Sequence, residues 1–117
     1  MSPLRPLASI EELEMALAES AERPVLLFKH SHTCGISTMA FDEMEAHLAA
    51  GPFPICYGLV TVQTHRHLSD EIARRLGVRH ETPQVILVRD GQAVWHASHF
   101  HVNAREVEEA LRAHAGE

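Results

Sequence analysis

The chain of 117 residues is 45% hydrophobic and 22% charged, and its ten Lys and Arg against sixteen Asp and Glu give a net charge of −6. One folded domain over residues 1–117 is expected at this length, and the apolar content excludes a disordered chain because it offsets the chain entropy. The acidic balance without a basic run disfavours a nucleic-acid partner, while the lack of a long apolar segment or signal peptide predicts a cytoplasmic protein without a membrane partner.

The first half of the chain predicts an edge strand, a helix, a buried strand and a second helix. Ser9 and Glu12 have the spacing of a capping box, which opens a helix that ends before Pro24. The continuous apolar run that follows suits a central strand buried on both faces. The edge strand, buried strand and second helix are predicted over Leu4–Ala8, Val25–Phe28 and Thr38–Ala50, and the second helix is expected to bury Met39, Phe41, Met44 and Leu48.

The second half predicts a strand, a short helix, a hairpin and a final helix. Gly77 follows the short helix, where glycine commonly ends a helix, and Ser69 or His67 is expected near its start. Asp90-Gly91 between two apolar runs is a strong signal for a hairpin turn. These elements are predicted over Ile55–Val62, Leu68–Leu76, Val85–Val88, Ala93–Ala97 and from Asn103 to about His114.

This order of elements predicts an α/β fold. Strands that are separated by helices imply right-handed parallel crossovers, and the hairpin adds an antiparallel strand. The expected result is a small mixed sheet of four to five strands flanked by helices on both faces, which is the thioredoxin-like arrangement.

Cys34 has the clearest chemical role, because it lies between a predicted buried strand and a predicted helix. A sulfur atom at a helix start lies near unpaired backbone N–H groups and the positive end of the helix dipole, and both favour the nucleophilic thiolate. Ligands of open α/β sheets also bind at the carboxyl ends of strands. Lys29 and His32 are close in the sequence and are expected to add positive charge.

Ser37 stands where dithiol sites of the thioredoxin type carry a second cysteine. The C-x-x-S spacing therefore predicts a monothiol site, in which Cys34 can attack a mixed disulfide but cannot form a disulfide with Ser37. We expect the Ser37 hydroxyl to donate a hydrogen bond to the Cys34 thiolate and to stabilise it.

Thr82-Pro83, just before a predicted strand, matches the position at which thioredoxin folds have a cis-proline beside the nucleophile. A cis X-Pro bond places backbone groups where an extended thiol substrate can form hydrogen bonds. The residues expected to contact the substrate are Thr33, Gly35, Ile36, Thr82 and Pro83.

The second cysteine is expected to be structural, and most histidines are expected to be solvated or structural. Cys56 lies in an apolar predicted strand and is expected to pack there, with a distant resolving thiol as the alternative. His30 and His99 come near strand ends and could flank the catalytic pocket. No metal site is expected, because no His-x-His pair has a third ligand at a firm spacing. The pairs are His30-x-His32, His65-x-His67 and His99-x-His101.

Six segments together form a fairly specific pattern: Val25–Ser31, Cys34-x-Ile36-Ser37, Gly77-Val78, His80–Gln84, Val94–His96 and Ser98-His99. In this pattern the chain resembles the monothiol bacilliredoxins, the YtxJ type of bacillithiol-system redox protein. The resemblance implies redox chemistry on protein–bacillithiol mixed disulfides, with Cys34 as the redox cysteine and Pro83 as the cis-proline. It implies S-thiolated client proteins and a partner reductase as partners, bacillithiol or a similar small thiol as co-substrate, and no bound cofactor.

Gly35 departs from the C-P-I-S pattern that is usual in this family and makes the site more similar to the C-G-F-S of monothiol glutaredoxins. Those proteins hold a [2Fe–2S] cluster with glutathione and carry a Gly-Gly-x-Asp signature, which the corresponding stretch from His99 to Asn103 lacks. A thiol–disulfide oxidoreductase is therefore favoured. The alternatives are an iron–sulfur or other metal carrier that uses Cys34, and a non-catalytic thioredoxin-fold adaptor.

Overall fold

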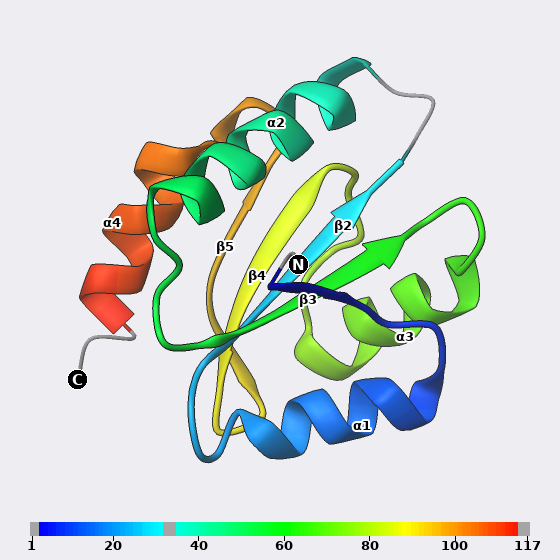
Figure 1. The fold of residues 1–117 in the computed structure, drawn as a ribbon. Coiled ribbons are helices and arrows are strands. Elements are labelled where there is room, and N and C mark those ends of the chain that lie inside the picture. Colours follow the sequence, from blue (N-terminus) through cyan, green and yellow to red (C-terminus); the bar gives the residue numbers. More distant parts are fainter. Residues whose placement is uncertain (1–2, 32–34, 115–117) are drawn as a thin grey trace.

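Figure 1 shows the computed structural model, which describes residues 3–31 and 35–114 as one mixed sheet with helices on both faces. This arrangement confirms the predicted α/β architecture. The strands are β1 (Leu4–Pro6), β2 (Val25–His30), β3 (Cys56–Thr61), β4 (Gln84–Arg89) and β5 (Gln92–Ser98). The helices are α1 (Ile10–Glu19), α2 (Gly35–Ala50), α3 (Arg66–Leu76) and α4 (Ala104–His114), with a short 3-10 helix η1 (His99–His101).

The sheet has the strand order β1-β3-β2-β4-β5, so the expected amino-terminal strand does lie at an edge. Strands β1, β3 and β2 are parallel, as predicted. The expected parallel crossover into β4 is wrong, because β4 runs antiparallel to β2, with Gln84 opposite Lys29 and Val88 opposite Val25. Residues 77–83 return the chain to the carboxyl end of β2 before β4 begins. From this end of the sheet, β4 has to run antiparallel to β2.

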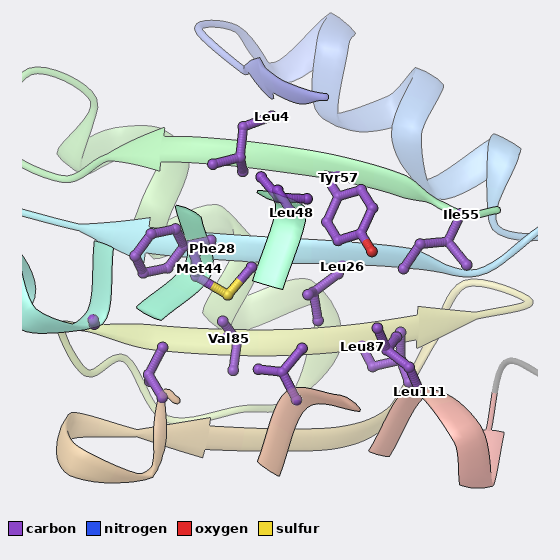
Figure 2. Close-up of a cluster of buried hydrophobic side chains, with 13 residues drawn as sticks. Leu4, Leu26, Phe28, Met44, Leu48, Ile55, Tyr57, Val85, Leu87 and Leu111 are labelled. Carbon is purple, nitrogen blue, oxygen red and sulfur yellow. The ribbon is translucent and has the colours of Figure 1, made fainter. Parts of the chain in front are cut away.

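The central strand β2 is buried along its whole length, as its continuous apolar run predicts. Its side chains alternate between two hydrophobic clusters, one under α2 and α4 and the other under α1 and α3. Figure 2 shows the first cluster, which consists of Leu4, Leu26, Phe28, Ala40, Met44, Leu48, Ile55, Tyr57, Val85, Leu87, Val102, Val107 and Leu111. The second consists of Leu7, Leu13, Val25, Leu27, Val60, Leu68, Ile72, Val78, Ile86 and Val88.

Helix α2 begins at Gly35 rather than at Thr38, so it starts directly after Cys34 in the sequence. Met44 and Leu48 are buried as expected, but the prediction for Met39 is wrong, since 57% of its surface is exposed. At 3.6 residues per turn, Met39 lies about 140° around the helix from Met44 and therefore faces solvent.

A buried histidine docks α2 onto α4. The ring of His47 is fully buried, with Nε2 2.8 Å from the hydroxyl of Tyr57 and Nδ1 2.9 Å from a carboxylate oxygen of Glu108. The Tyr57 hydroxyl also accepts a hydrogen bond from the backbone N–H of Phe53. Both ring nitrogens are thus satisfied, and His47 has a structural role.

The helix ends follow the predicted signals in most cases. Ser9 Oγ accepts a hydrogen bond from the Glu12 N–H. The Glu12 carboxylate accepts a hydrogen bond from the N–H of Ala8, the residue before Ser9, which completes the capping box one residue earlier than expected. Gly77 ends α3 in the left-handed conformation with φ of 65°. The N-cap of α3 is His65, so His67 lies near the start of the helix as predicted, whereas Ser69 is buried in the helix and does not cap it.

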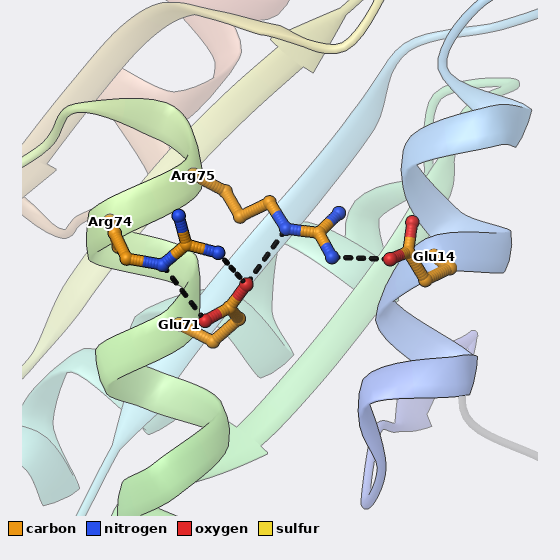
Figure 3. Close-up of polar contacts among 4 residues, drawn as sticks. All are labelled: Glu14, Glu71, Arg74 and Arg75. Carbon is orange, nitrogen blue, oxygen red and sulfur yellow. Dashed lines mark hydrogen bonds and ion pairs between the residues drawn. The ribbon is translucent and has the colours of Figure 1, made fainter.

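Arginine side chains connect α1 to α3 on the surface (Figure 3). Arg75 contacts both Glu71 in its own helix and Glu14 in α1, and Arg74 also bonds Glu71. Hydrogen bonds from Arg74 and then Arg75 lower the pKa of Glu71 to about 2. These groups are solvent-screened, so the network adds little to stability and mainly orients the two helices.

Asp90 and Gly91 form the predicted hairpin turn between β4 and β5, with φ of 52° and 73°. The backbone N–H of Gly91 donates to Ser20 Oγ, which ties the turn to the end of α1. Within the described parts of the chain, every helix is too short or too polar to cross a bilayer.

Candidate active site

The candidate site lies where β2 ends and α2 begins. His30 is the last residue of β2, and Gly35, the residue after Cys34 in the sequence, is the first of α2. Cys34, Thr33 and His32 lie outside the described residues, so their predicted roles stay predictions. The start of α2 nevertheless supplies the unpaired N–H groups and the positive dipole end on which the prediction for Cys34 depends.

Ser37 ties the strand to the helix. Its side chain is fully buried in the first turn of α2, and Oγ accepts a hydrogen bond from the backbone N–H of Ser31 at 3.1 Å. A hydroxyl that accepts one hydrogen bond still has its proton to donate. The serine therefore has a positioning contact that the sequence did not reveal, and its predicted bond to the Cys34 thiolate stays a prediction.

Gly35 and Ile36 open helix α2. Gly35 is exposed, and a Cβ atom at this position would meet no atom within 4 Å among the other described parts of the chain. The glycine that departs from the usual family pattern therefore fills no packing role. Ile36 is half-buried and faces a groove of about 120 Å³ between α2 and η1, the α2–η1 groove, lined by Ile36, Met39, Ala40, Glu43, His99, Phe100, Val102 and Asn103.

The peptide bond between Thr82 and Pro83 is cis, as predicted. Pro83 is buried directly before β4, and its carbonyl accepts a hydrogen bond of 2.9 Å from the backbone N–H of His99. Thr82 Oγ1 is buried without a hydrogen-bond partner in the part of the chain that the structure describes. His99, with φ of 58°, thus lies beside Pro83 and borders the α2–η1 groove. The sequence suggests a position near a strand end, at the edge of the catalytic pocket.

His30 closes the end of β2 against α2. His30 is buried, its ring packs against Phe28 and Phe41 with centroid distances of 5.6 Å and 5.2 Å, and Nε2 is 3.2 Å from Thr61 Oγ1. A pocket of about 240 Å³ is lined by His30, Ser31, Thr38, Phe41 and Asp42. His30 therefore borders a pocket beside the start of α2, as the sequence suggests.

Lys29 points to the opposite face of the sheet, toward α3. The side chain is fully buried, and Nζ lies 3.3 Å from Nδ1 of His80, which is also 3.1 Å from Ser69 Oγ. Burial lowers the pKa of Lys29 to about 8, although the charge of Asp70 opposes the shift. The expected role of Lys29 as charge support for Cys34 stays a prediction, whereas its contact with His80 is a finding that the sequence did not predict.

Three buried polar side chains hold the segment that leads to the cis-proline. Lys29 and Ser69 contact the His80 ring, and Gln84 Nε2 donates to the carbonyl of Arg79 at 2.9 Å. Lys29 and Gln84 are direct partners across β2 and β4. The sequence signal for this arrangement is a lysine that directly continues an apolar strand, since a buried ammonium requires a polar partner.

The amino-terminal end of α4 is closed by side chains of the chain itself. Ala104 N–H donates to Glu43 of α2 at 2.9 Å, and Glu106 N–H donates to Asn103 Oδ1 at 2.9 Å. These donors are therefore not available to the carboxylate of a bound thiol, which is consistent with the expected lack of a glutathione cradle at this turn.

Cys56 lies at the far end of the sheet from the start of α2. It pairs with Val25, the first residue of β2, and packs partly buried near α1. Burial and the neighbouring Glu19 raise the pKa of its thiol. The length of β2 places Cys56 about 16 Å from the end of the strand, whereas a disulfide needs Cα atoms within about 7 Å. This position favours a packing role.

One histidine in each of two His-x-His pairs contacts a neighbouring side chain. His101 Nδ1 contacts Glu106 at 3.0 Å, and His65 Nδ1 contacts Thr64 Oγ1 at 2.8 Å. Among residues 3–31 and 35–114, no group of three or more His, Cys, Asp or Glu side chains is arranged to hold a metal ion.

Comparisons with known proteins agree with this geometry. The family model described as monothiol bacilliredoxin BrxC matches residues 5–107. Among solved structures, a proposed oxidoreductase with a thioredoxin fold is 33% identical over 92% of each chain, with a TM-score of 0.81. Two thioredoxins share the fold at lower identity. That of Fasciola hepatica is 22% identical over 95% of this chain and 99% of its own, with a TM-score of 0.76, and that of Nicotiana alata is 16% identical over 97% of this chain and 94% of its own, with a TM-score of 0.77. The predicted thioredoxin-like fold is confirmed.

Proposed function

The chain belongs to the monothiol bacilliredoxin family and is a thioredoxin-like protein of thiol–disulfide redox chemistry, and from this premise we propose that it removes bacillithiol from mixed disulfides with client proteins through Cys34. The observation that carries the proposal is the start of α2 at Gly35, directly after Cys34, together with the cis bond at Thr82-Pro83. A thiol at a helix start is biased toward the reactive thiolate.

The transfer is a pair of thiol–disulfide exchanges. The Cys34 thiolate attacks the bacillithiol sulfur, a Cys34–bacillithiol disulfide forms, and the client thiolate leaves and takes up a proton. A second bacillithiol thiolate then attacks the bacillithiol sulfur on Cys34, which releases bacillithiol disulfide and restores the Cys34 thiolate. A partner reductase could supply the same two electrons. Ser37 cannot form a disulfide, so the enzyme depends on an external thiol for its second step.

The identity of the small thiol is tested with a model client that carries either bacillithiol or glutathione on the same cysteine. The reduced enzyme should remove bacillithiol faster, as followed by the intact mass of the client over time. Removal of glutathione at an equal or higher rate would contradict bacillithiol as the substrate, even with Cys34 as the nucleophile.

Replacing Ser37 by alanine should weaken the protein without abolishing transfer. The Ser31 N–H would lose its hydrogen bond to the Ser37 hydroxyl at a partly buried position, which should lower the free energy of unfolding by about 1–3 kcal/mol. Transfer should fall only in part, because the start of α2 still favours the Cys34 thiolate. Urea unfolding and the rate of bacillithiol removal measure the two effects. A Ser37→Ala enzyme as inactive as a Cys34 variant would show that the hydroxyl is essential to the chemistry.

A further inference from the structure

The ring nitrogen Nδ1 of His80 contacts two polar side chains. Lys29 Nζ lies 3.3 Å and Ser69 Oγ 3.1 Å from the same atom, Nδ1. An ammonium group donates hydrogen bonds and accepts none, so Nδ1 must be the unprotonated nitrogen that accepts. A neutral imidazole has one proton, which then resides on Nε2. The fold therefore selects the neutral Nε2–H form of His80.

The charges around His80 favour the same form. Burial and the Lys29 ammonium lower the pKa of His80, and Arg66 on α3 acts in the same direction. Asp70 on α3 and the neighbouring Glu81 act in the opposite direction with smaller effect. Because Lys29 is fully buried on the strand below, its charge is screened little by solvent.

The Nε2 atom of His80 has no hydrogen bond within residues 3–31 and 35–114, and the residue is only half-buried. His80 lies three residues before Pro83, and the segment between them leads into the cis bond at Thr82-Pro83. A donor with a fixed proton thus lies on the segment that leads to the cis-proline.

We propose that His80 is a substrate-binding residue whose Nε2–H donates a hydrogen bond to a carbonyl or carboxylate oxygen of the mixed disulfide, with Lys29 as the positioning residue that selects this form of the ring. The inference rests on the proposed function, since the mixed disulfide is its substrate. Its chemical basis is that a neutral, pre-oriented donor recognises an oxygen acceptor without a conformational cost on binding.

The state of the ring is tested by nitrogen chemical shifts of His80 in a pH titration of the whole protein. The wild type should show Nδ1 unprotonated and Nε2 protonated at neutral pH. In Lys29→Met, with a side chain of similar length but no charge, the His80 titration should move to higher pH. A protonated Nδ1 in the wild type, or the same titration in both proteins, would overturn the assignment. This result does not depend on any redox activity.

The contact with substrate is tested by kinetics. His80→Ala should lower kcat/KM for transfer about three- to tenfold, the effect of one hydrogen bond, whereas the alkylation rate of Cys34 by iodoacetamide should stay unchanged. His80→Gln keeps an N–H donor at the same reach and should recover most of the loss. His67→Ala, which removes an exposed histidine of α3, is the control and should behave as wild type.

Two substrates separate the sources of the acceptor oxygen. A loss with bacillithiol disulfide as well as with the client mixed disulfide assigns the oxygen to the small thiol, and a loss with the client alone assigns it to the client backbone. Equal kcat/KM for His80→Ala and wild type on both substrates would overturn the proposal. If the wild type fails to remove bacillithiol at all, the proposed function fails, and the chemical shifts still decide the state of His80.

Discussion

Replacing Cys34 by serine should reduce removal of bacillithiol from a client protein to the uncatalysed rate. A serine hydroxyl is not ionised at neutral pH and cannot form a disulfide with the small thiol, so the first exchange has no nucleophile. The fold should be retained, because serine is almost the same size as cysteine and the described core in the two clusters around β2 is left intact. The measurement is the rate at which the mass of the small thiol is lost from the client.

Cys56→Ser is the matched control for this experiment. Cys56 lies beside Val25 at the opposite end of the sheet, so its loss should leave the transfer rate and the bound small thiol on Cys34 unchanged. Loss of activity in Cys56→Ser, or a clean intramolecular disulfide between the two cysteines after oxidation of the monomer, would contradict the monothiol mechanism.

Most of the fold follows from local patterns in the sequence. The capping box at Ser9, the glycine at the end of α3 and the turn at Asp90-Gly91 each depend on a few neighbouring residues, and all three are confirmed. The direction of β4 is different, because a parallel and an antiparallel strand carry the same apolar run. It depends on the path of residues 77–83, which no local pattern encodes.

Local sequence patterns predict the candidate active site only in part, as they do the fold. The cis bond before Pro83 and the start of a helix next to Cys34 could be predicted, because each is tied to a short motif. The contact of Lys29 with His80 joins residues from β2 and the segment after α3, which only the folded sheet brings together. A lysine at the end of an apolar strand signals a buried partner, but the sequence does not identify that partner.

The free energy of unfolding should rise with pH between about 8 and 10.5 because of Lys29. Its pKa is about 8 in the folded protein and 10.5 in the unfolded chain, since burial disfavours the ammonium. Below pH 8 both states are protonated, and the folded state bears the full cost of the buried charge. Between the two values the unfolded chain binds more protons, so stability increases, by about 3 kcal/mol in total for this shift.

Lys29→Met should lack this rise, and the difference between the two proteins isolates the lysine. Cys56 and Tyr57, whose pKa values burial raises, lower the stability as pH increases through the same range, but both are present in wild type and variant. Urea unfolding at about pH 7.5 and about pH 10 measures the four free energies. Arg79→Met, which removes an exposed cation from the nearby segment, should keep the wild-type pH dependence. Parallel pH profiles for wild type and Lys29→Met would show that the Lys29 ammonium is solvated in the folded protein rather than buried against His80.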